Sequence, residues 1–339
     1  MGEDGVMEAR LRDSLYQVLA ILYRYAESLA VIEYPRKMER RSIDVAVRLR
    51  GGKRILVKVA IDAGSLPKSE VQELISLSAV LGTAPLIVAR MKRGEELVEG
   101  VVYDRLGARV VSPETLESLV SGRGEVYVYE SKDSFKVRVD PAKLREKRVN
   151  LGLSLGDLAM ALGTSRKTVY DYERGGSDPT LEKAEKLVSI LGEDILAPLD
   201  VFSPPETTPR RQEPQSRLEA EVTRVLERAG YTVVRARRTA ADMGCAGRGE
   251  RIILLLDERH PRRRASEDKI ESFDRLAKTV GVDRYAVVTE DPARRRLLAR
   301  DEEINVVTLE EVEGLLVGEG LLPNRGPGGR EEHDSVKDS

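Results

Sequence analysis

"LSLGDLAMALGTSRKTVYDYERGG", residues 153–176, is the stretch of this sequence that most restricts the fold. Ser154 is suited to cap a helix, because Asp157 follows three residues later as the acidic member of a capping-box pair. Gly163 is suited to a sharp turn, and Gly175 to the end of a second helix. Two short helices joined by a tight turn predict a helix-turn-helix.

The apolar residues of this stretch fall on faces that can pack together when two helices cross. A small residue, Ala159, stands where a steep crossing leaves no room for a larger side chain. A preceding helix is predicted from Pro141 to about Asn150, and a fourth helix is predicted to open at Pro179, which completes a small bundle. The apolar positions are Leu155, Leu158, Ala159, Leu162, Val169 and Tyr172.

Two cations, Arg166 and Lys167, stand side by side in the predicted first turn of the second helix. The helix dipole disfavours positive charge at that end, so an anionic ligand would explain their position. Seven basic against four acidic residues between Pro141 and Gly176 give this segment a net charge of +3, whereas the whole chain has −2. A ligand that carries phosphate groups would fit this pattern.

Residues 141–199 resemble the Cro/C1 family of DNA-binding domains, on the motifs "LREKR", "LSLGDLAMALGTSRKTVYDYERG" and "DPTLEKAEKLVSILG". The resemblance implies that the second helix of the motif enters the major groove with its first residues at base edges. It also implies that Glu173 pairs with a first-helix arginine, Arg148 or Arg145, and that Leu155 replaces a frequent glutamine. The residues assigned to the structure of the motif are Leu158, Ala159, Gly163, Val169, Glu173 and Arg148.

The same resemblance implies which residues meet the DNA. Arg166 can donate two hydrogen bonds to guanine, Lys167 can do the same or bind phosphate, and Asp171 can accept from cytosine or orient Arg166. Thr168 and Tyr170 are expected at phosphates or flanking positions. The predicted DNA-binding set is Ser165, Arg166, Lys167, Thr168, Tyr170, Asp171 and Arg174.

Proline-rich, glycine-rich and alternating stretches predict how the chain is divided. "VFSPPETTPRRQEPQ" is typical of an extended linker, and "VYVYESKDSFKVRVD" predicts a β-hairpin between Val126 and Val139. The predicted divisions are an α/β domain over 1–123, a hairpin connector over 124–140, the helix-turn-helix domain over 141–199, a linker over 200–215, a second α/β domain over 216–322 and a disordered tail over 323–339.

The two outer domains follow one plan of helices and short apolar strands, most closely in "VVSPETLESLV" and "VVTLEEVEGLL". That plan resembles the restriction-endonuclease-like fold, whose active members hold Mg²⁺ with an aspartate on one strand and an acidic-x-Lys triplet on the next. The predicted fold class is therefore multi-domain, α/β plus all-α, with a central helix-turn-helix bundle that follows a hairpin and is flanked by two similar, degenerate nuclease-like domains.

The metal-binding positions implied by this resemblance are incomplete, so we predict no catalytic residues and no metal site. In the first domain Asp44 is well placed, but Lys58 stands where the acid would be and Ala60 where the lysine would be. If Lys58 is taken as the lysine, Leu56 is left as the acid. The corresponding residues of the second domain are Asp242, with Asp257 and Arg259 out of register.

Composition excludes several other classes of protein. No apolar run approaches the roughly 18 residues of a membrane span, and "MGEDGVMEARLRD" lacks the features of a signal peptide, so we expect a cytoplasmic protein with no membrane contact. Cys245 is the only cysteine, and the only histidines are His260 and His333, so neither a disulfide nor a zinc centre is expected. No Gly-rich phosphate loop or cofactor lysine motif is present, so no cofactor is expected.

Most of the chain resembles an archaeal family of Cro/C1-type transcriptional regulators, in which a hairpin such as "EVYVYESKDSFKVRVD" leads into the helix-turn-helix after an α/β domain. We therefore expect a sequence-specific DNA-binding transcriptional regulator and not an enzyme. One motif reads a half-site, so a homodimer is expected, with the outer domains in dimerisation or in contact with the transcription machinery. The alternatives are a structure-directed nuclease targeted by the helix-turn-helix, and a scaffold for transcription proteins that binds DNA weakly.

Overall fold

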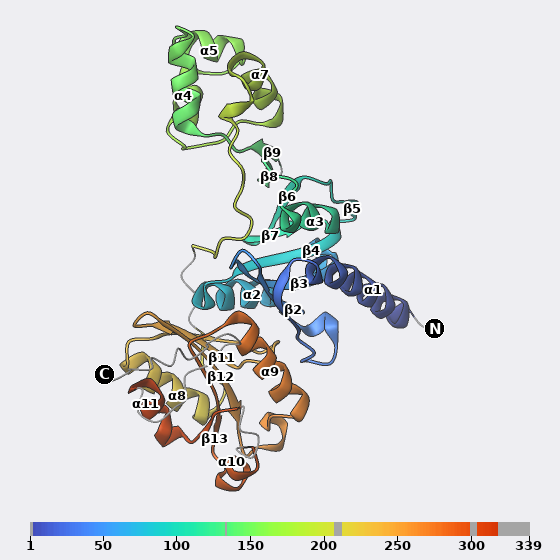
Figure 1. The fold of residues 1–339 in the computed structure, drawn as a ribbon, viewed down its shortest axis with the longest axis vertical. Coiled ribbons are helices and arrows are strands. Elements are labelled where there is room, and N and C mark those ends of the chain that lie inside the picture. The colour runs from blue at the N-terminus through green and yellow to red at the C-terminus, as the bar shows by residue number, and fades with distance from the viewer. Residues whose placement is uncertain (1–2, 133, 207–211, 299–303, 318–339) are drawn as a thin grey trace, which may run out of the picture.

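The computed structural model describes residues 3–132, 134–206, 212–298 and 304–317. Three parts follow one another along the long axis of the molecule (Figure 1). A helical bundle (141–196) lies at one end, an α/β part that we call the N-terminal unit (3–137) lies in the middle, and a second α/β part, the C-terminal unit (216–317), lies at the other end. The chain therefore passes from the middle to the bundle and back again before it forms the far end.

The N-terminal unit is built on a mixed sheet in the order β1-β2-β3-β4-β7-β6-β8-β9, with β5 beside β4. The pairs β1–β2 and β2–β3 are antiparallel, whereas β3–β4 and β4–β7 are parallel. The elements are α1 (Glu3–Tyr23), β1 (Ala26–Val31), β2 (Val45–Leu49), β3 (Arg54–Asp62), α2 (Lys68–Leu81), β4 (Ala84–Lys92), β5 (Glu95–Glu96), β6 (Val101–Arg105), β7 (Ala108–Val111), α3 (Pro113–Ser121), β8 (Val128–Ser131) and β9 (Ser134–Val137).

The central strands are continuous apolar runs because both faces of the sheet are covered. Alternate residues of β3 enter different cores, as the two-residue period of a strand requires. Leu56 and Ala60 lie in the core beneath α2, whereas Ile55 and Val57 lie in the core beneath α1. Burial of the Leu56, Ile55 and Val57 side chains contributes about 1.5–3 kcal/mol each to the free energy of folding.

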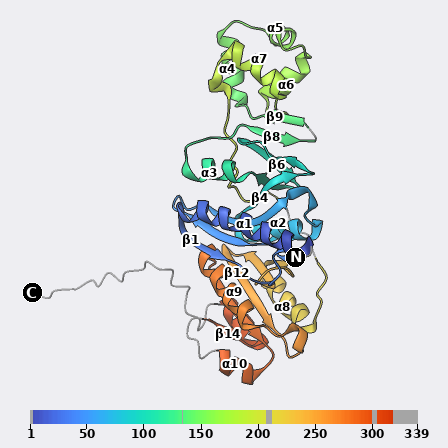
Figure 2. The ribbon, with the colours of Figure 1, turned by 90° about the vertical axis from the view of Figure 1, so that its right-hand side faces the viewer.

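The hairpin extends the N-terminal sheet instead of acting as a free connector. Strands β8 and β9 pair antiparallel, and β8 also pairs parallel with β6, where Val101 lies opposite Val128. Strand β6 was not anticipated from the sequence. The hairpin is therefore the edge of the sheet that lies next to the bundle (Figure 2).

The bundle closes around one apolar core. Ser154 and Asp157 form the expected capping box at the start of α5. Helix α7 begins at Leu181 with Thr180 as its N-cap, so Pro179 precedes this helix and does not open it. The reason is that the Pro179 carbonyl accepts a backbone hydrogen bond from β9, which keeps this segment extended. The helices are α4 (Pro141–Asn150), α5 (Leu155–Ala161), α6 (Arg166–Glu173) and α7 (Leu181–Leu191).

The C-terminal unit is a smaller mixed sheet in the order β10-β11-β12-β13-β14. Its successive pairs are antiparallel, antiparallel, parallel and parallel, the same series as in β1-β2-β3-β4-β7. Helix α10 was not anticipated, and the predicted tail over 323–339 lies outside the described residues. The elements are α8 (Arg217–Arg228), β10 (Thr232–Arg235), β11 (Met243–Gly247), β12 (Glu250–Asp257), α9 (Glu267–Val280), β13 (Arg284–Thr289), α10 (Pro292–Leu298), β14 (Val306–Val307) and α11 (Leu309–Val317).

The two α/β units share a continuous apolar core. Helix α2 packs on β10 and β11, and helix α9 packs on β1 and β2. One cluster of buried side chains contains Leu77 and Val80 of α2 together with Leu276 and Val280 of α9. The units are therefore held together by packing and not only by the intervening chain (Figure 1).

The bundle is fixed to the hairpin through the buried carboxylate of Asp178. Its Oδ2 accepts a hydrogen bond from the Tyr129 hydroxyl at 2.7 Å, and its Oδ1 accepts one from the Val139 amide at 3.4 Å. Arg138 Nη1 lies 3.4 Å from Oδ2. Burial, together with the Asp178 hydrogen bond, raises the pKa of Tyr129 to about 12, so the phenol stays protonated and donates at neutral pH. Backbone hydrogen bonds across this joint run from Val137 to Pro179, from Asp140 to Ile195 and from Ala197 to Arg138.

We predict that Tyr129→Phe loosens this joint. Asp178 would lose one donor while its carboxylate stays buried, which costs about 1–3 kcal/mol in free energy of unfolding. Denaturant unfolding measures the loss, and faster amide exchange at Val139 would locate it. Tyr127→Phe is the matched control, because the Tyr127 hydroxyl donates to the exposed Glu125. Equal losses for the two variants would contradict the prediction.

Candidate nucleic-acid interface

Helix α6 is the second helix of the motif, and Ser165 is its N-cap. Ser165 Oγ accepts a hydrogen bond from the Thr168 amide at 3.1 Å and lies 2.9 Å from the Thr168 hydroxyl. Capping satisfies an amide that the start of a helix leaves without a partner. These two predicted contact residues therefore shape the N-terminus of α6, a position at which backbone N–H groups favour a phosphate.

Arg166 and Lys167 are exposed in the first turn of α6. The Arg166 guanidinium lies across Gly156 of α5, where an added Cβ would be 2.8 Å from Nε. Glycine at this position therefore leaves room for the arginine between the two helices. The pKa of Asp157 is lowered mainly by its hydrogen bond with Ser154 and further by the charge of Arg166.

The exposed side of α6 continues with Tyr170 and Arg174, one turn apart. Arg174 Nη1 donates to the Tyr170 hydroxyl at 3.2 Å, and its guanidinium carbon lies 5.5 Å from the ring centroid. A cation–π contact of this exposed kind contributes about 0.5–1 kcal/mol. Asp171 is half-buried, four residues after Lys167, so the two residues share a helix face.

The ion pair expected between α6 and the first helix is made by Arg148 and not by Arg145. Arg148 Nε and Nη2 donate to the two carboxylate oxygens of Glu173, the second at 3.0 Å, and Nη1 donates to the Leu153 carbonyl at 2.7 Å. The side chains of Arg148 and Glu173 are only 10% and 5% exposed. The hydrogen bond to Glu173 raises the pKa of Arg148. Arg145 is exposed instead.

The remaining residues assigned to the structure of the motif hold its helices together. Gly163 has a φ of +62°, a left-handed conformation that favours glycine and forms the turn between α5 and α6. On α4, Lys147 pairs with Asp194 at 2.6 Å, whereas Lys143 is exposed. The buried apolar members of the set are Leu158, Ala159 and Val169.

In the N-terminal unit, the positions that correspond to the metal site of active nucleases hold a buried ion pair. Asp44 Oδ2 accepts a hydrogen bond from the Val59 amide at 2.8 Å and lies 3.3 Å from Lys58 Nζ. Lys58 Nζ donates to the Met38 carbonyl at 2.9 Å. Ala60 and Leu56 lie in the apolar core. A cation of the protein therefore neutralises Asp44.

A further acidic residue of this cluster, Glu70 of α2, was not predicted from the sequence. Glu70 is buried, interacts electrostatically with Lys58 and Asp44, and has a pKa raised by its burial. Within the described part of the chain, Asp44 Oδ1 and Glu70 Oε2 have no hydrogen-bond partner. The sequence signal for Glu70 was its position directly before Val71 in the predicted helix. Most residues of that helix are buried.

The C-terminal unit neutralises its corresponding aspartate with a lysine from a helix. Asp242 Oδ2 accepts a hydrogen bond from the Leu256 amide at 2.8 Å, and both carboxylate oxygens accept from Lys269 Nζ of α9, at 2.7 and 2.8 Å. Asp257 is instead hydrogen-bonded to the Ala265 amide at 2.9 Å and the Thr289 hydroxyl. The carboxylates of Asp257 and Asp242 therefore have separate hydrogen-bond partners and do not form the paired acids of a metal site. Arg259 donates to the Glu290 carbonyl.

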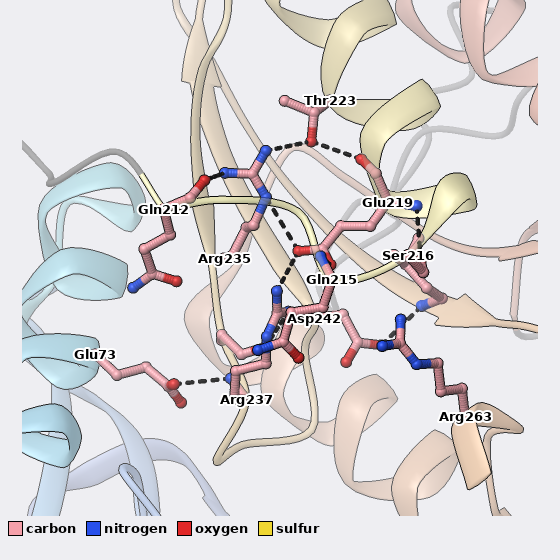
Figure 3. A network of polar contacts seen from close by, with 12 residues as sticks. Glu73, Gln212, Gln215, Ser216, Glu219, Thr223, Arg235, Arg237, Asp242 and Arg263 are labelled. Atoms are coloured by element: carbon pink, nitrogen blue, oxygen red, sulfur yellow. Dashed lines mark hydrogen bonds and ion pairs between the residues drawn. The ribbon is translucent and has the colours of Figure 1, made fainter.

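A polar network surrounds Asp242 (Figure 3). Glu219 Oε1 of α8 lies 3.0 Å from Arg235 Nε and 2.5 Å from Arg237 Nη2. The Arg237 amide in turn donates to Glu73 of the N-terminal unit at 2.7 Å. A cavity of about 150 Å³ opens beside this network, with cations and acids mixed along its wall.

Comparisons with known proteins match two segments of the chain. Residues 12–124 match the PD-(D/E)XK superfamily domain, and residues 144–196 match a helix-turn-helix family. A protein of Aeropyrum pernix, named "Putative HTH-type transcriptional regulatory protein", is 42% identical over 290 residues, which cover 84% of this chain and 88% of that protein.

The chain belongs to this archaeal family of HTH-type transcriptional regulatory proteins. A family member of the same name from Sulfolobus acidocaldarius is 30% identical over 72% of this chain and 80% of its own length. One from Pyrococcus furiosus is 32% identical over 60% of this chain and 66% of its own length. A solved structure of a Vibrio cholerae protein aligns with 60% of this chain and 70% of its own chain, at 14% identity and with a TM-score of 0.21.

Two further features of this family member concern metals and membranes. Among the described residues, no group of three or more His, Cys, Asp or Glu side chains is placed to hold a metal ion. No helix in the described ranges has the length and apolar character needed to cross a membrane.

We predict that Glu173→Ala strongly destabilises the bundle. The Arg148 guanidinium would stay buried without its carboxylate, and breaking a buried pair in this way costs about 3–5 kcal/mol. Urea unfolding followed by circular dichroism measures the loss. Asp194→Ala is the control, because it breaks the exposed pair with Lys147 and should change the stability little. A Glu173→Ala variant as stable as the control would disprove the structural role of the pair.

Proposed function

We propose that the protein is a sequence-specific DNA-binding transcriptional regulator that binds double-stranded DNA through α6. The observation that carries this proposal is the row of exposed cations on a short helix whose buried side is fixed by the Arg148–Glu173 pair. Cations at a helix N-terminus are unfavourable without an anion nearby. Phosphate at that end of α6 would reverse the penalty.

In this proposal α6 lies in the major groove. Arg166 donates two hydrogen bonds to guanine, and to do so it leaves its resting place over Gly156. Lys167 binds a neighbouring base or phosphate, and Asp171 accepts from cytosine or orients Arg166. Contacts to the sugar-phosphate backbone are assigned to Ser165, Thr168, Tyr170 and Arg174.

The joint at Asp178 supports a single orientation of α6 relative to the α/β units. A helix-turn-helix that is fixed in this way reads one half-site. Two chains on a pseudo-palindrome would read both halves, so we propose a homodimer on DNA, with the transcription machinery as a further partner. The site of action would be the cytoplasm.

We predict that Arg166→Ala weakens binding to a duplex selected from a random pool by about 1–3 kcal/mol and relaxes the preference at one base pair. Lys143→Ala, at an exposed position of α4, should weaken binding to all duplexes alike and reduce the number of counterions released on binding by about one. Fluorescence anisotropy on selected and scrambled duplexes measures both effects. Equal losses of Arg166→Ala on the two duplexes would mean that Arg166 contacts only the backbone.

A second candidate function, DNA hydrolysis in the N-terminal unit, is favoured by one observation. Glu70 supplies a second carboxylate beside Asp44, with Lys58 close to both. Two acids and a lysine are the groups that Mg²⁺-dependent hydrolysis requires. The match of residues 12–124 to the PD-(D/E)XK superfamily domain agrees with this arrangement.

The burial of the same cluster argues against hydrolysis. Asp44 is 0% exposed, and Lys58 and Glu70 are each 2% exposed, so a phosphodiester has no direct path to them. The Ser42 amide, beside this cluster, donates to the Arg238 carbonyl of the C-terminal unit at 2.9 Å. Lys58 also stands 3.3 Å from Asp44, where its ammonium group competes with a divalent cation. We therefore retain the regulator as the proposed function.

We predict that the purified protein leaves linear, supercoiled and branched DNA intact in Mg²⁺ or Mn²⁺, while it still binds its selected duplex. Agarose gels after overnight incubation test this prediction. Divalent-dependent cleavage that disappears in both Asp44→Ala and Glu70→Ala, but not in Asp104→Ala, a half-buried residue near the end of β6, would establish the hydrolase instead. Cleavage that disappears only in Asp242→Ala would place the activity in the C-terminal unit.

A further inference from the structure

The contact between the two α/β units has matching parts on its two sides. Helices α2 and α9 each contain 14 residues and each end at a glycine in the left-handed conformation, Gly82 with φ +61° and Gly281 with φ +65°. Each helix follows the third strand of a sheet with the same series of pairings. The two helices therefore hold equivalent positions in their own units.

The two helices also make reciprocal contacts. Helix α2 crosses to β10 and β11 of the C-terminal unit, and α9 crosses to β1 and β2 of the N-terminal unit. A Cβ added at Gly244 of β11 would lie 2.9 Å from Leu77 and 3.0 Å from Val80, so α2 lies directly against this strand. The residue that corresponds to Gly244 on β2 is the fully buried Ala46.

Polar contacts across the interface are reciprocal as well. Glu73 of α2 accepts a hydrogen bond from the Arg237 amide at 2.7 Å, and Ser272 of α9, at the corresponding helix position, accepts one from the Glu33 amide at 3.3 Å. The two donor amides also hold corresponding positions in their own units. Arg237 follows Ala236, whose N–H donates to the Asp242 carbonyl, and Glu33 follows Ile32, whose N–H donates to the Asp44 carbonyl. The contact thus repeats under an approximate two-fold rotation.

Arginines approach the C-terminal ends of both helices in the same reciprocal way. The Arg251 guanidinium lies against Gly82 at the end of α2. Arg54, the residue of β3 that corresponds to Arg251, donates from Nη1 to the Val280 carbonyl at the end of α9 at 3.3 Å, and the Arg48 guanidinium lies against Gly281 there. Cations at the C-terminus of a helix are favoured by its dipole. Both sides of the interface therefore use one kind of interaction.

We propose that the C-terminal unit occupies the place of a second copy of the N-terminal unit. The face formed by α2, β1 and β2 would then be a self-association surface that each chain covers internally. A two-fold contact requires a surface that fits a copy of itself. In support, Leu77 of α2 corresponds to Leu276 of α9, and Val80 corresponds to Thr279, a side chain of nearly the same shape.

This inference changes the expected role of the outer domains. Their shared face is occupied within one chain, so it is not free to join two chains. Two helix-turn-helix bundles can pair on DNA only through another surface. The inference does not rest on DNA binding, because it follows from the packing of the two α/β units alone.

A full-length Gly244→Phe variant tests the proposal. The benzyl group cannot fit against Leu77 and Val80, so the C-terminal unit is released from α2 whether or not that unit stays folded. Light scattering should then show a species of twice the mass of the unaltered chain. Gly51→Phe is the matched control, because a Cβ at Gly51 meets nothing within 4 Å, and its mass should not change.

A second substitution identifies the surface that pairs. Val80→Asp in the Gly244→Phe background places a charge on α2, and the mass should return to that of the unaltered chain. The proposal is overturned if Gly244→Phe keeps the mass of the unaltered chain, if it forms large aggregates instead of a defined species, or if the doubled mass survives Val80→Asp.

Discussion

The orientation of the helix-turn-helix depends on one buried carboxylate, that of Asp178. A buried carboxylate is costly unless donors surround it. Its donors, the Tyr129 hydroxyl and the Val139 amide, belong to the hairpin and to the segment that follows it. Asp178 is therefore satisfied only when the bundle sits on the hairpin in one way. Because β8 of that hairpin pairs with β6, the constraint extends into the sheet of the N-terminal unit.

The aspartate that nuclease-like folds use for metal binding has a structural role in both units. Asp44 accepts the amide of Val59, and Asp242 accepts the amide of Leu256, so each carboxylate ties its segment to the neighbouring strand. Each then needs a positive charge, because a buried anion is unfavourable alone. In one unit that charge is a lysine on the strand, and in the other it is a lysine on the helix. The same carboxylate position is thus kept with two different partners.

The sequence predicted the parts of the fold that depend on neighbouring residues, and it failed where distant segments decide. The capping box at Ser154 and the turn at Gly163 were readable because each involves only a few consecutive residues. Strand β6 was missed because "VVYDR" has no clear period, and it becomes a strand by pairing with β7 and β8. Helix α10 was likewise missed.

The candidate site shows the same division. The contact residues of α6 could be proposed because residues 141–199 resemble the Cro/C1 family, which implies the face that meets DNA. The choice between Arg145 and Arg148 could not be made, because the two lie on one helix and only the packing of α4 against α6 buries Arg148. Glu70 was missed because its partners are distant in the sequence: Asp44 directly precedes β2, and Lys58 lies in β3.

The reciprocal packing of α2 and α9 has a consequence for how the protein is made. Helix α2 leaves the ribosome early, whereas the strands that cover it, β10 and β11, come from the last third of the chain. At 5–20 residues per second, the roughly 150 residues between α2 and β10 take about 8 to 30 seconds to synthesise. If the face of α2 pairs with a copy of itself as proposed, a nascent chain would present Leu77 and Val80 during that interval to its neighbours on the same messenger RNA. The spacing of ribosomes along the message would therefore influence how many chains cover α2 with their own C-terminal unit.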